Sequence, residues 1–80
     1  MFDAAPKERL DLKGLKCPLP VLRANKALRA LATGEVLEVQ ATDPASAKDF
    51  VTYCDTAGHA LLAQREDGGV FTFLIRKGGA

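Results

Sequence analysis

Hydrophobic and polar residues along the chain form six patterned segments. Over residues 18–32, apolar side chains recur every three or four positions, which predicts a helix with one buried stripe. Alternating or β-branched stretches predict four strands, at residues 8–12, 35–41, 59–66 and 70–76. The apolar stripe of the helix consists of Val21, Ala24, Leu28 and Leu31, with Leu22 and Ala32 beside them.

The Asp43-Pro44 pair predicts the start of a second helix. Aspartate is a favourable N-cap, and proline is tolerated at the first helical position because its missing N–H costs nothing there. Gly34 is expected to close the first helix and Gly58 the second. Residues 67–69 (DGG) predict a tight turn that pairs the last two strands antiparallel. The apolar stripe of the second helix consists of Ala47, Phe50, Val51, Cys54 and Ala57.

The predicted order of elements is β-α-β-α-β-β. This order indicates an α/β (α+β) two-layer sandwich, with two helices on one face of a mixed four-stranded sheet. If the strands joined by each helix are parallel, both helices start at the same edge of the sheet. Cys17 and Asp43 then share that edge, where α/β folds usually place their chemistry.

The chain has 80 residues, so we expect one domain over residues 1–80, ordered from about 8 to 77 and loose at 1–7 and 78–80. A hydrophobic fraction of 48% and a charged fraction of 26% are typical of a globular domain. The charges are segregated: residues 13–34 hold five cations and no acid, whereas residues 35–69 hold seven acids and two cations. These are either ordinary solvated faces or a basic rim around Cys17 that attracts a thiolate, an anionic substrate or an acidic partner.

The chain contains no apolar run near the roughly 18 residues of a membrane span, and its N-terminus lacks a signal-peptide pattern. We therefore expect a cytoplasmic protein with no membrane partner. There, Cys17 and Cys54 are expected to be thiols rather than a disulfide. Two cysteines and one histidine without C-x-x-C or H-x-x-H spacing predict no metal site, and we expect no cofactor.

The first helix is entered through Cys17-Pro18-Leu19-Pro20. Prolines are harmless in a first turn, because the N–H groups there have no helical acceptor. With Cys17 as the N-cap, the free N–H groups of Leu19 and Val21 and the helix dipole would favour a thiolate. We therefore expect Cys17 to be exposed and nucleophilic, with a lowered pKa. The plain alternative is that the prolines only start a helix and Cys17 is a small capping residue.

Cys17 has no obvious catalytic companion in the sequence. Nothing ties the single histidine, His59, to it, which argues against a cysteine hydrolase. Pro20 occupies the place of the resolving cysteine of a thioredoxin-type oxidant, and Cys54 lies on an apolar stripe and is expected in the core. A lone activated thiolate suits the acceptance of a group from one protein and its transfer to another.

Four markers in order resemble the TusA/SirA-like family of small sulfur carriers. They are Gly14 before the Cys-Pro-x-Pro segment, then Gly34-Glu35, Asp43-Pro44 and the terminal FLIRKGG at residues 73–79. The resemblance extends from about Leu10 to Gly79 and implies the same sandwich fold. It also implies a sulfurtransferase whose cysteine, here Cys17, carries a persulfide and does no more than relay sulfur.

The resemblance further implies the partners. A cysteine desulfurase or a rhodanese-like protein would be the donor, and a DsrE-like or other thiol protein the acceptor. Many members of the family have glutamate between the two prolines, where this chain has Leu19. Thiolation of tRNA, molybdenum-cofactor maturation and sulfur oxidation therefore stay open as pathways.

The predicted site centres on Cys17, and Leu19, Arg23 and Lys26 are expected to dock partners. Two other functions stay open: a redox-sensing regulatory or interaction module that acts through Cys17, and an RNA-binding domain. The RNA-binding hypothesis ranks last, because no Gly-rich clamping loop is present and the aromatic residues do not interleave with the basic ones. Supporting residues of the site are Lys13, Lys16, Pro18, Leu19, Pro20, Val21 and Asp43.

Overall fold

The computed structural model describes residues 5–79, and the order of its elements is the predicted one. Each element lies within two residues of its predicted bounds. None of the helices in the described part of the chain is long and apolar enough to cross a membrane. The elements are β1 (Glu8–Asp11), α1 (Leu19–Ala30), β2 (Val36–Ala41), α2 (Ser46–Ala57), β3 (Ala60–Asp67) and β4 (Val70–Arg76).

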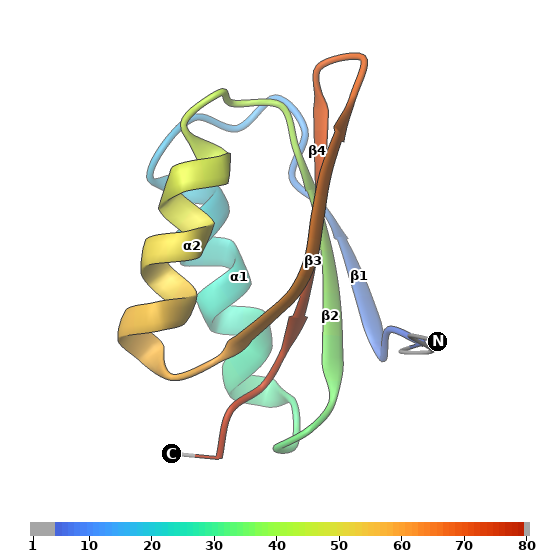
Figure 1. The fold of residues 1–80 in the computed structure, drawn as a ribbon, viewed down its shortest axis with the longest axis vertical. Helices are drawn as coiled ribbons and strands as arrows, with labels where there is room; N and C mark the ends of the chain where they lie inside the picture. The colour runs from blue at the N-terminus through green and yellow to red at the C-terminus, as the bar shows by residue number, and fades with distance from the viewer. Residues whose placement is uncertain (1–4, 80) are drawn as a thin grey trace.

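The four strands form one mixed sheet in the order β1-β2-β4-β3. β1 is parallel to β2, whereas β4 is antiparallel to both β2 and β3. Because β4 runs the other way between them, β2 and β3 point in the same direction. Each helix therefore joins two strands of like direction, and Figure 1 shows both helices on one side of the sheet with the other side open. This is the predicted two-layer sandwich.

The core lies between the helices and the facing side of the sheet. In β2 and β4 the buried positions alternate, so that Leu37 is opposite Ile75 and Val39 is opposite Phe73. Phe50 of α2 stacks on Phe73 with a ring-centroid distance of 4.6 Å. This packing fixes which side of each helix faces the sheet and therefore which residues reach the surface. The helices contribute Ala24, Leu28, Phe50 and Cys54 to the buried cluster.

Three residues assigned to the buried stripes are in fact on the surface. Leu22 is 55% exposed, Val51 is 45% exposed, and Ala32 is exposed beyond the end of α1. Successive residues turn about 100° around a helix axis. Leu22 thus lies well away from the buried Ala24, and Val51 lies a quarter-turn or more from the buried Phe50.

The predicted loose ends are only partly within the described residues, since residues 1–4 and 80 lie outside them. The Lys7 N–H donates to the Val36 carbonyl at 2.7 Å, and the Gly78 N–H donates to His59 Nδ1 at 3.0 Å. The backbones of Lys7 and Gly78 are thus hydrogen-bonded to the rest of the domain.

Candidate functional site at the Cys17 edge of the sheet

The loops that leave β1 and β2 lie together at one edge of the sheet, at the top of the view in Figure 1. The Leu12 N–H donates to the Gln40 carbonyl at 2.8 Å, and the Gly14 N–H donates to Thr42 Oγ1 at 2.9 Å. These bonds fix the loop that carries Cys17 to the end of β2.

Asp43 holds the backbone of Cys17 directly. The Cys17 N–H donates to Asp43 Oδ2 at 2.5 Å, and the Ala45 N–H donates to Asp43 Oδ1 at 3.1 Å. The hydrogen bond from Cys17, then that from Ala45, hold the pKa of Asp43 below its usual 3.8, and the charge of Lys16 acts in the same direction. Asp43 thus keeps its charge and positions Cys17.

Asp43 does not cap α2 in the predicted way. The helix begins at Ser46 with Ala45 in the capping position, because Pro44 and Ala45 form a turn before it. The Ser46 N–H donates to the main-chain carbonyl of Asp43 at 2.9 Å. The carboxylate is thereby left to bond the Ala45 N–H and the Cys17 loop.

Cys17 is likewise not the N-cap of α1. Pro18 holds that position, the Cys17–Pro18 peptide bond is cis, and Pro20 lies buried in the first turn. The Leu19 N–H donates to the Lys16 carbonyl at 2.8 Å, so it does not donate a hydrogen bond to the Cys17 sulfur. The prediction of a sulfur at the cap, bound by the Leu19 amide, is wrong because one additional turn precedes the helix.

Of the two cysteines, Cys17 is an exposed free thiol and Cys54 is a buried one. Only 2% of Cys54 is exposed, and burial raises the pKa of its thiol to about 11. The predicted core position of Cys54 is therefore confirmed, and Cys17 is the thiol that another protein can reach.

The charges around Cys17 oppose the predicted lowering of its pKa. Hydrogen bonding to the Asp49 carboxylate raises the pKa of the Cys17 thiol, and partial loss of solvent and the charges of Asp49 and Asp43 add to this. Lys13 does not offset the effect, because its Nζ lies 3.2 Å from Asp11 Oδ1 and 3.1 Å from Gln40 Oε1. The prediction of a lowered pKa for the Cys17 thiol is therefore wrong, because its surroundings raise the pKa.

Asp49 is the site residue that the sequence patterns did not indicate. It lies in the first turn of α2 and shares with Cys17 a shallow, largely apolar groove of about 550 Å³ between the two helices. The available signal was an acidic residue in the first turn of a helix that starts at the Cys17 edge. The groove is also lined by Pro18, Val21, Lys48, Thr52, Tyr53 and Thr56.

The family model described as "Sulfurtransferase TusA" matches residues 8–77. The chain belongs to the TusA family. It is 51% identical over 70 residues to the sulfur carrier protein TusA of Allochromatium vinosum, which covers 88% of this chain and 92% of that protein. It is 46% identical over 77 residues to the sulfur carrier protein TusA of Pseudomonas putida, 96% of each chain.

The fold also matches a solved member of this group. The crystal structure of the SirA-like protein from Desulfitobacterium hafniense has a TM-score of 0.78 and 30% identity, over 90% of this chain and 99% of that one. The resemblance to TusA/SirA-like sulfur carriers is thus confirmed. Sulfur transfer between a protein that supplies sulfur and one that takes it up is the general function of the TusA family.

The residues predicted to dock partners lie on the surface of α1. Leu19 is 42% exposed, and Arg23 and Lys26 are exposed further along the helix. None of the three lines the Cys17 groove between the helices. Arg23 and Lys26 line a different groove of this TusA-family chain, between α1 and β1, whereas Leu19 lines neither groove.

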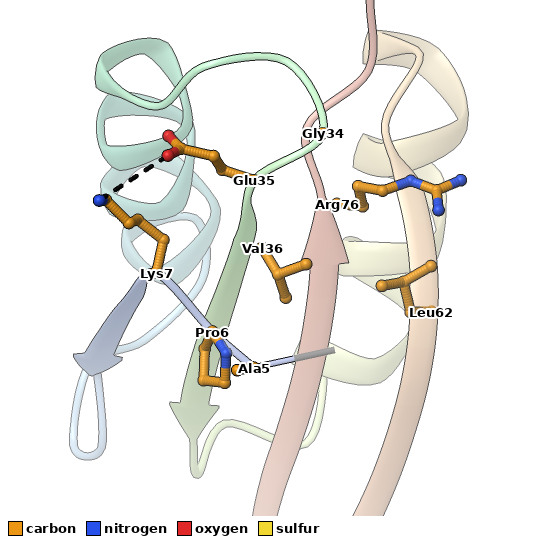
Figure 2. A pocket seen from close by; sticks show the side chains of 8 residues that line it. All are labelled: Ala5, Pro6, Lys7, Gly34, Glu35, Val36, Leu62 and Arg76. Atoms are coloured by element: carbon orange, nitrogen blue, oxygen red, sulfur yellow. Dashed lines mark ion pairs between the residues drawn. The ribbon is translucent and has the colours of Figure 1, made fainter. Parts of the chain in front are cut away.

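A further hollow, of about 520 Å³, lies at the opposite edge of the sheet (Figure 2). Lys7 and Glu35 form an ion pair of 3.9 Å on one side of it, and Leu62 and Arg76 lie on the other. No cysteine or histidine lines it. The thiol chemistry of a TusA-family protein therefore belongs to the Cys17 edge.

Proposed function

We propose that this chain carries sulfur as a persulfide on Cys17. The observation that carries the proposal is the contrast between the two thiols: Cys17 is exposed, with its backbone anchored by Asp43, whereas Cys54 is enclosed in the core. A carrier needs one thiol that two different proteins can reach in turn.

The transfer is a pair of thiol exchange steps. The Cys17 thiolate attacks the outer sulfur of a donor persulfide, the sulfur–sulfur bond of the donor breaks, and the donor cysteine leaves as a thiolate. Cys17 then holds the outer sulfur as Cys17–S–SH. The thiolate of an acceptor protein attacks that outer sulfur and releases the Cys17 thiolate. No external oxidant or reductant is consumed.

The neighbouring residues have distinct roles in this scheme. Asp43 holds the Cys17 N–H, so it is a positioning residue. Asp49 shares the groove with Cys17, and its negative charge favours the protonated thiol until a partner binds. Pro18 and Val21 line the groove in which the partner's cysteine would approach, and the charge of Lys16 acts on Asp43.

A cysteine desulfurase or a rhodanese-like protein is the proposed donor, and a DsrE-like or other thiol protein the proposed acceptor. A thiol that must stay reduced between transfers suits the reducing cytoplasm. Redox sensing is less well supported, because Cys54, the other cysteine of the chain, is too buried to form a disulfide with Cys17.

Mass spectrometry after incubation with a cysteine desulfurase and free cysteine tests the proposal. The wild-type protein should gain the mass of one sulfur atom on Cys17, and dithiothreitol should remove it. Cys54→Ala is the matched control and should gain the same mass. Labile sulfur on the Cys17→Ser protein would show that the assignment is wrong, as would faster modification of Cys17 by peroxide than by polysulfide.

A further inference from the structure

α1 covers only part of β1. α1 packs against β2 and α2, whereas β1 is an edge strand of the sheet. A groove of about 670 Å³ lies between α1 and β1, which we call the α1–β1 groove. Leu10 and Leu12 line it from the β1 side, and Ala27 and Ala30 line it from α1.

Two cationic side chains of α1 line this groove. Arg23 and Lys26 are exposed there, and within residues 5–79 neither makes an ion pair with a carboxylate. The sequence of α1 itself contains no acidic residue. Glu8, at the start of β1, is the acidic residue that lines the groove. The groove thus has an apolar part, a cationic wall and one carboxylate at an end.

The exposed Leu19, at the start of α1, lies on the same side of the helix as the two cations of the groove. Leu19, Arg23, Lys26 and Ala30 are spaced by four, three and four residues, which places them on one side of the helix. Leu19 is two residues from Cys17 and 42% exposed. A partner segment seated in the groove would therefore lie beside the entry to α1.

We infer that the α1–β1 groove binds an acidic amphipathic helix of a protein partner. Its apolar side packs on the half-buried Leu10 and Ala27, and its carboxylates pair with Arg23 and Lys26. The small side chains of Ala27 and Ala30 let a helix approach to the usual interaxial distance of about 8–10 Å. Glu8 disfavours carboxylates near the start of β1 and so sets the direction of the bound helix.

The groove fits a protein helix better than a nucleic acid. Phosphates could pair with Arg23 and Lys26, but they would leave the apolar side chains uncovered and would face the charge of Glu8. The inference adds to the proposed function, since the partner would be a sulfur donor or acceptor. The binding itself does not require a reactive Cys17.

Fluorescence anisotropy with a labelled synthetic peptide tests the inference. The probe is a helical peptide of about five turns, with leucine on one stripe and glutamate on both sides of it. Wild-type protein should bind it, and the R23E/K26E double variant should bind about tenfold or more weakly, because two attractions become repulsions. A scrambled peptide of the same composition, which has no apolar stripe, should not bind.

The matched control is the R29E/R65E double variant, which changes net charge equally. Arg29 and Arg65 are exposed and line no part of the α1–β1 groove, so the affinity should stay within about twofold of wild type. Ala30→Trp should fill the groove and abolish binding, while its circular dichroism stays that of the wild type. Equal binding by the two double variants, or tighter binding of single-stranded RNA than of the peptide, would overturn the inference.

The two proposals can fail separately. Cys17→Ser protein should bind the peptide as wild type does, because Cys17 does not line the groove. Failure of wild-type Cys17 to take up sulfur from inorganic polysulfide would count against the persulfide proposal alone. Failure of the wild-type protein to bind the peptide would count against the groove alone.

Discussion

At Cys17, two carboxylates act on different atoms of one residue. Asp43 accepts the backbone N–H and so determines where the sulfur sits, whereas the carboxylate of Asp49 raises the pKa of the thiol. The nucleophile is the thiolate, so the free protein is expected to react slowly with small oxidants and electrophiles at neutral pH. Contact with a partner that draws Asp49 away from the thiol would release this restraint.

The Asp49→Asn variant is expected to lower the pKa of Cys17, because it removes the negative charge that favours the protonated thiol. The rate of alkylation by iodoacetamide, measured against pH, reports this pKa. Its midpoint should move to lower pH in Asp49→Asn. Asp55→Asn, at an exposed position of the same helix, is the matched control and should leave the midpoint near wild type. An equal shift in both variants would contradict the role of Asp49.

At the level of the elements, the start of α1 shows which structural features local sequence rules can predict and which they cannot. Periodicity located every helix and strand, because the burial that produces the pattern is repeated over many residues. The start of α1 depends instead on contacts distant in sequence, such as the bond from Cys17 to Asp43, 26 residues away. Capping rules describe neighbouring residues, so they placed Cys17 at the cap.

The same distinction explains the errors at the site. The shared edge of Cys17 and Asp43 follows from topology, which the order of elements already indicated. The raised pKa of Cys17 depends on how the first turn of α2 faces the thiol, and no spacing in the sequence encodes that. Leu22 was misplaced for another reason: an apolar residue can lie on the wrong side of a helix and stay exposed.

The first turn of α1 contains no acidic residue, although a negative charge there interacts favourably with the helix dipole. Leu19→Glu should therefore be more stable than Leu22→Glu by about 0.3–1 kcal/mol at low salt. Both positions are exposed, and each new glutamate has a cation four residues later, Arg23 or Lys26, so the comparison isolates the dipole. Urea unfolding measures the difference.

The difference between these two variants should shrink as salt is added, because ions screen the dipole. A difference that persists in molar salt would indicate that lost apolar contacts of Leu19 or Leu22, rather than charge, determine the result. Sulfur transfer by Leu19→Glu, measured beside Leu22→Glu, would also show whether partners distinguish the residue between the two prolines.

Across the whole molecule, the C-terminal segment closes the end opposite Cys17. Lys77 Nζ donates to the Leu31 carbonyl at 2.5 Å and to the Arg29 carbonyl at 3.4 Å, and so binds the end of α1. A Cβ at position 78 would overlap with the Gly58 carbonyl, so this close approach requires a glycine. The terminal Lys-Gly-Gly thus joins α1, β4 and the turn after α2 and holds the two layers together.

His59 makes this closure dependent on pH. Its Nδ1 accepts the Gly78 N–H, which requires the neutral ring, and burial, then the charge of Lys77, lowers the pKa of His59 below 6.5. The unfolded chain therefore takes up a proton at a higher pH than the folded protein does. The contribution of His59 to stability is fully present above about pH 6.5 and is lost as pH falls through the folded pKa.

Urea unfolding at a series of pH values between about 7.5 and 5 tests this dependence, since the ordinary carboxylate pKa values lie lower. The free energy of unfolding of the wild type should fall over this range. His59→Gln can still accept the Gly78 N–H but does not titrate, so its unfolding free energy should change less. The protection factor of the Gly78 amide, which corrects for the intrinsic dependence of amide exchange on pH, should fall at the lower pH in the wild type alone. Parallel pH profiles for the two proteins would show that His59 does not control the closure.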